Sequence, residues 1–470
     1  MPIQYDEHMS DADAIMWNNE RDPMLRSTIL SVMVLDREPD AARIGEAVER
    51  SLATIPRLRQ HVVLDPLHAA TPAWRVDEHF DLRYHLRHVA LPGQGTMRDL
   101  LDLAEPIAMQ AFDKDRPLWE LYRVSGLEGG RAALLIKLHH AISDGVGLVR
   151  MTASLVERSP EPEVHPETRR RASAGELAVP EHGAFFESLH ALRYRAETEI
   201  GRTARLVQAL GRGARDLTAD PVGTARSAAE LAASVARTLR PVSEPKSKLM
   251  HKRSFGVRFA EIEYPLDRLK AAARLVDGTL NCVFVGGVTG GMRRYHDRHG
   301  ASVETLRMTM PINVRAGEAG EHAGNQFSPA RFEVPVALAD PVERMRQIAA
   351  AVARERHEPA LPLVSEVAGL VGELPSVVAV NLMGSMLKAI DLVTSNVPGP
   401  PFPVYASGAR VERMFGFGPL SGAASNITLF SYDGSVYIGV NTDPAAIPDA
   451  DVFLECLRAG MEEVLAVAAE

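Results

Sequence analysis

The chain has 470 residues, of which 46% are hydrophobic and 24% are charged, and its formal net charge at pH 7 is −9. This composition is that of an ordinary globular protein, so it excludes a chain that is disordered throughout. The length exceeds what one hydrophobic core usually organises and predicts two domains. The negative net charge gives no electrostatic reason to expect a nucleic acid as a partner.

The cysteines and the distribution of apolar residues indicate in which cellular compartment the protein is expected. The two cysteines, Cys282 and Cys456, have no Cys-x-x-Cys spacing, so neither a disulfide framework nor a zinc cluster is predicted. The first 20 residues carry Asp6, Glu7, Asp11 and Asp13 among their acids and lack the apolar core of a signal peptide. The apolar run at 374–387 is shorter than the ~20 residues of a membrane span. We therefore expect a cytoplasmic protein that does not cross a membrane.

In the first part of the chain, hydrophobic periodicity predicts helices and then strands. Pro106 lies inside the second helical pattern and is expected to end or kink that helix. The predicted helices are 41–59, 96–111 and about 146–157, and the predicted strands are 118–124 and 132–138.

The middle of the chain changes character. Prolines and charged residues mark exposed loops at both ends of 159–253, and the Ala- and Arg-rich stretch 185–240 has a mostly helical pattern. Beyond it, strands are predicted at 255–262, 305–312 and 435–441, and helices at 266–275, 342–356 and 451–467. Interleaved strands and helices predict two α/β sandwich domains, at 1–158 and 254–470, joined by the mostly helical linker 159–253.

The chemistry is indicated by His139-His140-x-x-x-Asp144-Gly145, which follows the second predicted strand. A histidine with its unperturbed pKa of ~6.5 is largely neutral at pH 7 and can accept a hydroxyl proton. Ser143 lies in no Gly-x-Ser-x-Gly elbow, and neither cysteine is near in sequence. A base without a nucleophile favours direct transfer over a covalent intermediate.

This motif resembles that of the superfamily of chloramphenicol acetyltransferase and the peptide-synthetase condensation domains. Further segments resemble a narrower family, the bacterial wax ester synthase/diacylglycerol acyltransferases, and the resemblance covers nearly the whole chain. These segments are Pro117-Leu118-Trp119, Asn281 at the start of an apolar segment, PINVR at 311–315, GNQF at 324–327 and SNVPGP at 395–400.

The resemblance implies two chloramphenicol-acetyltransferase-like sandwich domains with the active site in a channel between them. It implies an O-acyltransferase that moves a long-chain acyl group from acyl-CoA to diacylglycerol or a fatty alcohol. His140 would be the general base, and no metal or bound cofactor would be needed. The enzyme is expected to work peripherally, at the inner face of a membrane or on lipid droplets, through 374–387 or the arginine-containing linker.

Each implied site residue also has a structural interpretation. His139 is expected to be structural rather than catalytic. Asp144 is expected to orient its loop by pairing with Arg315 or Arg26, and Gly145 to serve backbone shape. The remaining candidates have two interpretations each: Asn281 as oxyanion donor or helix cap, Ser395 and Asn396 as active-site or turn-capping residues, and Pro117, Leu118 and Trp119 as channel wall or core.

One position departs from the resemblance. The family pattern has Asn-Asp where this chain has Asn281-Cys282, and Cys282 is expected to be a small buried apolar residue. Two alternative functions therefore stay open. One is acyl transfer to a small polar acceptor, and the other is a catalytically weak, lipid-binding paralogue.

Overall fold

A computed structural model describes the backbone of residues 4–65, 70–142, 152–161, 242, 244–313, 322–323, 327–356 and 383–468. The first half of the predicted helix 146–157, the helical stretch of the linker and most of the apolar run 374–387 lie outside the described residues.

The first sheet has six strands in the order β13-β14-β2-β7-β6-β5. Its centre is β7, which runs antiparallel to both β2 and β6 and is buried along nearly its whole length. The strands are β2 (Thr28–Leu35), β5 (Leu86–Ala90), β6 (Trp119–Leu127), β7 (Arg131–His139), β13 (Tyr405–Ala406) and β14 (Ala409–Phe417).

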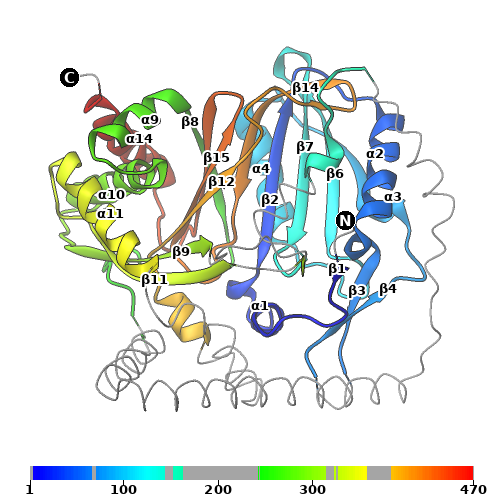
Figure 1. Cartoon of the computed structure of the whole chain (residues 1–470), viewed down its shortest axis with the longest axis horizontal. Coiled ribbons are helices and arrows are strands. Elements are labelled where there is room, and N and C mark those ends of the chain that lie inside the picture. The colour runs from blue at the N-terminus through cyan, green and yellow to red at the C-terminus, as the bar shows by residue number, and fades with distance from the viewer. Residues whose placement is uncertain are drawn as a thin grey trace, which may run out of the picture.

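The second sheet has six strands in the order β11-β9-β12-β15-β16-β8. They are β8 (Arg258–Pro265), β9 (Thr305–Asn313), β11 (Phe327–Pro335), β12 (Leu392–Pro398), β15 (Ser425–Tyr432) and β16 (Ser435–Thr442). Figure 1 shows the two sheets side by side, with four helices gathered beside the second sheet. Those helices are α9 (Leu266–Leu275), α10 (Leu280–Arg298), α11 (Pro341–Arg356) and α14 (Ala450–Ala466).

β14 connects the two halves. It belongs to the C-terminal half of the chain but pairs antiparallel with β2 of the first sheet, as the orange and blue strands of Figure 1 show. It also approaches β16 closely, because a Cβ at Gly439 would lie only 2.1 Å from the carbonyl oxygen of Gly416. The predicted division at 254–470 does not anticipate this exchange of a strand between the halves.

The boundaries of two helices in the first half follow from prolines and capping residues in the sequence. α2 (Ala41–Thr54) stops before Pro56, and the rest of the predicted 41–59 helix is a short 3-10 turn, η2 (Pro56–Arg59). α4 (Met97–Met109) begins with a capping box in which Thr96 and Asp99 exchange hydrogen bonds. α4 continues for three residues beyond Pro106. Of the two expected effects of Pro106, an end or a kink, the end of the helix is therefore wrong.

The remaining elements are small. They are α1 (Asp11–Asn19), η1 (Pro23–Leu25), α3 (Leu82–His85), η3 (Glu128–Gly130), the antiparallel pair β3 (Gln60–Val63) and β4 (Ala73–Val76), and the parallel pair β1 (Gln4–Tyr5) and β10 (His322–Ala323). Within the described residues no single helix is long and apolar enough to cross a membrane; α9 and α10 meet that test only as a pair bent by 95°.

Candidate active site

The histidine pair lies at the end of β7, beside the Pro-Leu-Trp segment. The His139 N–H donates to the Leu118 carbonyl oxygen at 3.0 Å, and Trp119 stands opposite Leu138 in the sheet. The chain turns immediately afterwards, because the Ile142 N–H donates back to the His139 carbonyl oxygen at 3.0 Å. Two segments separated by about 20 residues in sequence are therefore neighbours in the sheet.

His139 is fully buried and has defined contacts on both ring nitrogens. Its Nδ1 accepts from the Ala141 N–H at 3.0 Å, which places the ring proton on Nε2. Nε2 lies 3.0 Å from Glu20 Oε1, and the rings of Trp17 and Phe112 meet the imidazole edge-on. These contacts are those of a residue that holds its surroundings in place, as expected for His139.

Glu20, at the C-terminal cap of α1, is a residue that no sequence motif marked. Burial alone raises the pKa of its carboxyl, but the adjacent His139 imidazole and the Ser27 N–H outweigh it, so that this pKa lies below its usual value. The Ser27 N–H donates to Glu20 Oε1 at 3.1 Å. The carboxylate thus joins the end of α1, the start of β2 and His139.

His140 is half-buried, unlike its neighbour. Its N–H donates to the Ser27 carbonyl oxygen at 2.8 Å. Ser27 is therefore tied to Glu20 through its N–H and to His140 through its carbonyl. The buried carboxylate fixes both histidines, one through the side chain and the other through the backbone of Ser27.

A cavity of about 50 Å³ lies between the two halves, and the residues on either side of Ser27 in the chain, Arg26 and Thr28, line it. The first half contributes Arg26, Thr28 and the end of α4, and the second half contributes the start of β8, the end of β14 and Asn441. The lining is largely apolar, with Leu30, Met109 and Phe417 among its members. Complete ligand pockets measure about 300–1,000 Å³, so this recess accommodates a small part of a substrate.

The second half holds Asn281, Ser395 and Asn396. Asn281 is the second residue of α10, whose cap is Thr279, so the helix-cap interpretation of Asn281 is wrong. Its Nδ2 lies 3.1 Å from Met310 Sδ, a weak acceptor. Ser395 and Asn396 lie within β12, opposite Thr428 and Leu429 of β15, so the turn-capping interpretation is also wrong.

Two other candidates are packed in cores. Trp119 is buried, donates from Nε1 to the Leu58 carbonyl oxygen at 2.8 Å and stacks on His85, and Leu118 is fully buried. Cys282 is buried near the start of α10, with its Sγ 3.4 Å from Thr279 Oγ1. These are the packing roles expected for the Pro-Leu-Trp segment and for Cys282.

Several expected residues lie outside the described part of the chain. They are Ser143, Asp144, Gly145 and Arg315. The pairing of Asp144 with an arginine stays a prediction. Arg26, one of the two arginines proposed for it, donates from Nη1 to the Met109 carbonyl oxygen at the end of α4. Among the residues that the structure describes, no three His, Cys, Asp or Glu side chains gather as a metal site would require.

Two α/β halves, with β14 of the second half paired into the sheet of the first, and a His-His pair at a strand end define a protein with the chloramphenicol-acetyltransferase-like fold. Solved structures share it. The wax ester synthase/diacylglycerol acyltransferase of Marinobacter aquaeolei VT8 matches with a TM-score of 0.65 at 20% identity, over 99% of this chain and 100% of that one. The starter condensation domain of rhizomide synthetase, in complex with C8-CoA and Leu-SNAC, matches with a TM-score of 0.57 at 14% identity, over 98% and 94%.

Comparison of the sequence with known families and relatives identifies one family within this fold class. Residues 9–284 match the wax ester synthase/diacylglycerol acyltransferase catalytic domain, and residues 323–464 match the C-terminal domain of the same family. A putative diacylglycerol O-acyltransferase of Mycobacterium tuberculosis is 34% identical over 98% of this chain and 92% of its own length. The chain belongs to the wax ester synthase/diacylglycerol acyltransferase family, and it is an acyltransferase of that type.

Proposed function

We propose that the protein transfers a long-chain acyl group from acyl-CoA to a lipid alcohol, either diacylglycerol or a fatty alcohol, with His140 as the general base. The observation that carries this proposal is the arrangement at the end of β7. His140 is half-buried beside a buried, paired His139, and its backbone is fixed by Ser27 next to the cavity between the halves. His139 is fully buried whereas His140 is half-buried, so His140 is the better candidate to take up a substrate proton.

The chemistry needs one base and no covalent intermediate. His140 removes the proton of the acceptor hydroxyl while that oxygen attacks the thioester carbonyl carbon. The tetrahedral oxyanion then collapses with cleavage of the C–S bond, and the imidazolium returns its proton to the CoA thiolate. The products are an ester and free CoA. Asn281, whose amide hydrogen meets only a weak sulfur acceptor at 3.1 Å, is the proposed donor to the oxyanion.

Family membership supports the lipid substrates. The Mycobacterium relative is named a putative diacylglycerol O-acyltransferase, and the Marinobacter relative a wax ester synthase/diacylglycerol acyltransferase. Lipid acceptors are scarce as free monomers in water, so we propose that the enzyme works in the cytoplasm, peripherally at a membrane or lipid-droplet surface. Flotation with anionic vesicles tests this surface binding, which absence of co-flotation would exclude.

An acceptor panel tests the reaction. Labelled palmitoyl-CoA is offered with diacylglycerol, hexadecanol, a short polar alcohol and an amine, and ester or amide products are separated. We expect product with the lipid alcohols and much less in a His140→Ala variant. Preference for the short polar alcohol would establish the small-acceptor alternative. Absence of product with every acceptor, together with tight binding of the acyl-CoA, would identify a lipid-binding paralogue.

A further inference from the structure

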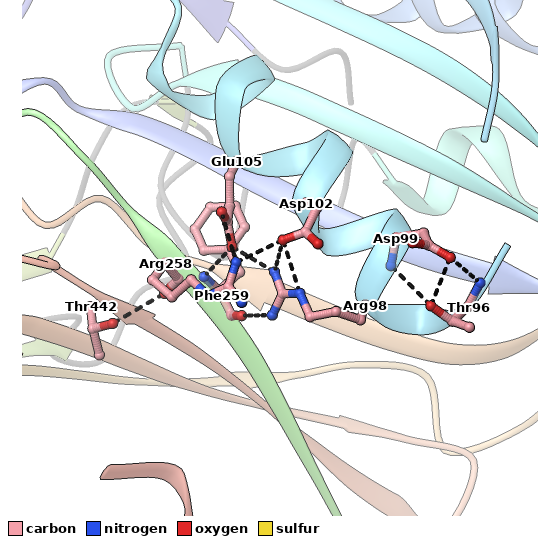
Figure 2. Close-up of polar contacts among 8 residues, drawn as sticks. All are labelled: Thr96, Arg98, Asp99, Asp102, Glu105, Arg258, Phe259 and Thr442. Carbon is pink, nitrogen blue, oxygen red and sulfur yellow. Dashed lines mark hydrogen bonds and ion pairs between the residues drawn. The ribbon is translucent and has the colours of Figure 1, made fainter. Parts of the chain in front are cut away.

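The edge of the second sheet is fastened to the first half by a pair of side chains on α4. β8 is the last strand of its sheet, so the outward backbone groups of Phe259 have no strand partner. Instead, the Phe259 N–H donates to Glu105 Oε1 at 2.9 Å, and Arg98 Nη1 donates to the Phe259 carbonyl oxygen at 2.6 Å. Figure 2 shows both side chains reaching from the helix to the strand.

The two clamping side chains are also paired with each other. Arg98 Nη2 lies 2.6 Å from Glu105 Oε1, and Arg258 Nη1 lies 2.7 Å from Asp102 Oδ1 and 3.5 Å from Glu105 (Figure 2). Positions 98, 102 and 105 recur at helical spacing, so they share one face of α4. Glu105 is almost buried, and removal of its carboxylate would leave the Phe259 N–H without its acceptor.

The clamped residue is also a wall of the cavity. The Phe259 ring is 1% exposed and stacks on Phe417 with ring centroids 4.3 Å apart and an interplanar angle of 24°. Phe417 ends β14, the strand that crosses between the halves, and both rings line the cavity together with Leu30 and Met109. The backbone clamp and the ring stack thus fix one aromatic wall at the place where the two halves meet.

We propose that Phe259 determines how long an apolar chain the enzyme accepts, and that Glu105 and Arg98 act as positioning residues for it. This inference rests on the proposed acyl transfer to or from chains that enter between the halves. Phe259 and Phe417 both line the recess of about 50 Å³, and their rings are stacked, so the Phe259 side chain bounds the recess on this side. A smaller side chain there would extend an apolar space that favours additional methylene groups.

The test varies the chain on each substrate separately. Saturated acyl-CoAs from octanoyl to eicosanoyl are assayed with one fixed alcohol, and alcohols of the same lengths are assayed with one fixed acyl-CoA. A methylene in a hydrophobic pocket is worth roughly 10–200-fold in discrimination. Phe259→Leu and Phe259→Ala should raise the kcat/KM ratio of long to short chains by about tenfold or more. The series that responds identifies whether the acyl or the alcohol chain occupies the recess.

Matched variants separate specificity from stability. Phe453→Leu removes the same volume from a fully buried site that packs on Tyr295 in the second core, so the chain-length profile should not change. Glu105→Ala should shift the profile in the same direction as Phe259→Leu, but less. Asp102→Ala removes the ion pairs of Asp102 with Arg98 and Arg258 but leaves the Glu105 acceptor of the Phe259 N–H in place, so it should shift the profile less than Glu105→Ala.

The outcomes are distinguishable from failure of the proposed function. If folded Phe259→Leu and Phe259→Ala proteins keep the wild-type ratio in both series, the inference is overturned. If the wild-type protein transfers no acyl group, the proposed function fails. If the wild type or only the variants are inactive, binding is measured instead, as the rise in unfolding temperature that each acyl-CoA or alcohol causes. The rises for long and short chains give the ratio of long-chain to short-chain binding. An unchanged binding ratio then overturns the inference, and an increased ratio supports it.

Discussion

The two halves hold their candidate site residues by different physical means. In the first half, the end of β7 is held by a buried carboxylate, an imidazole and directed backbone hydrogen bonds around Glu20, His139 and Ser27. In the second half, the start of α10 is held by apolar packing of Val283 and Phe284 and by weak sulfur contacts, with Asn281 on Met310 and the buried Cys282 on Thr279. Charge changes should therefore perturb the first half, whereas volume and capping changes should perturb the second.

The largest effect is expected at His140. His140→Ala should lower turnover by roughly 10²–10⁴-fold, as loss of a general base typically does, with the fold retained because the side chain is half-buried. His139→Ala is the matched change one residue away. It should be milder in chemistry and more damaging to stability, since that imidazole is fully buried and paired with Glu20. Measured kcat and thermal unfolding of both variants decide; an essential His139 beside a dispensable His140 would reverse the assignment.

Asn281 is expected to have the next largest effect. Loss of an oxyanion donor costs about 10²–10³-fold in kcat, so Asn281→Ala should fall in this range with little change in stability. Asn281→Asp is the isosteric control, because it keeps the size and removes the donor. Rates and thermal unfolding are compared with the wild type. An unchanged kcat in both variants would show that Asn281 does not contact the reacting atoms.

A Glu20 variant tests whether a charged side chain stabilises the end of β7 in the first half. Glu20→Gln should reduce the free energy of unfolding by about 1–3 kcal/mol at pH 7, because His139 loses its charged partner. The pKa of Glu20 is lowered from 4.5 in the native protein, so its stabilisation is present above the unfolded-state value and is lost as the pH falls through the native value.

The pH dependence supplies the measurement. Denaturant unfolding of both proteins should show a wild-type advantage that is constant near neutrality and shrinks below a pH of about 4.5. Glu49→Gln, on the exposed face of α2, should show no such advantage. An advantage that does not change on acidification would mean that the carboxylate charge is not what stabilises this end of the fold.

The smallest effect is expected at Cys282. Cys282 is the third residue of α10 after the cap Thr279, so Cys282→Asp would recreate the Thr-x-x-Asp box that α4 has at Thr96 and Asp99. A cap contributes about 0.5–1 kcal/mol, opposed here by burial of the new carboxylate. We expect acyl transfer to be preserved or raised, with a small change in stability.

The reverse exchange in α4 is the control for that variant. Asp99→Cys should lose the capping box and about 1 kcal/mol of stability. Unfolding free energies and transfer rates are compared for both variants. Complete inactivation of Cys282→Asp would show that this position does not tolerate a charge.

Local patterns predicted much of the secondary structure. The helix at 266–275 was predicted at its observed bounds, and the strands that became β6, β7, β9 and β16 lie within one to three residues of their predicted ends. α10 could not be predicted in this way. Its glycines are poor helix formers, costing about 1 kcal/mol each, but they let α14 approach so closely that a Cβ on Gly460 would lie 2.2 Å from the Gly291 nitrogen.

The sequence by itself determined the family, through the His-His-x-x-x-Asp-Gly spacing and several short segments elsewhere in the chain, because the residues of each segment are close together in sequence. It also indicated that His139 would be structural and that His140 was the better candidate for the base. Only the tertiary structure revealed Glu20, the transfer of β14 to the first sheet and the clamp on Phe259. Each of these depends on contacts between residues more than 100 positions apart, and hydrophobic periodicity carries no information about such pairs.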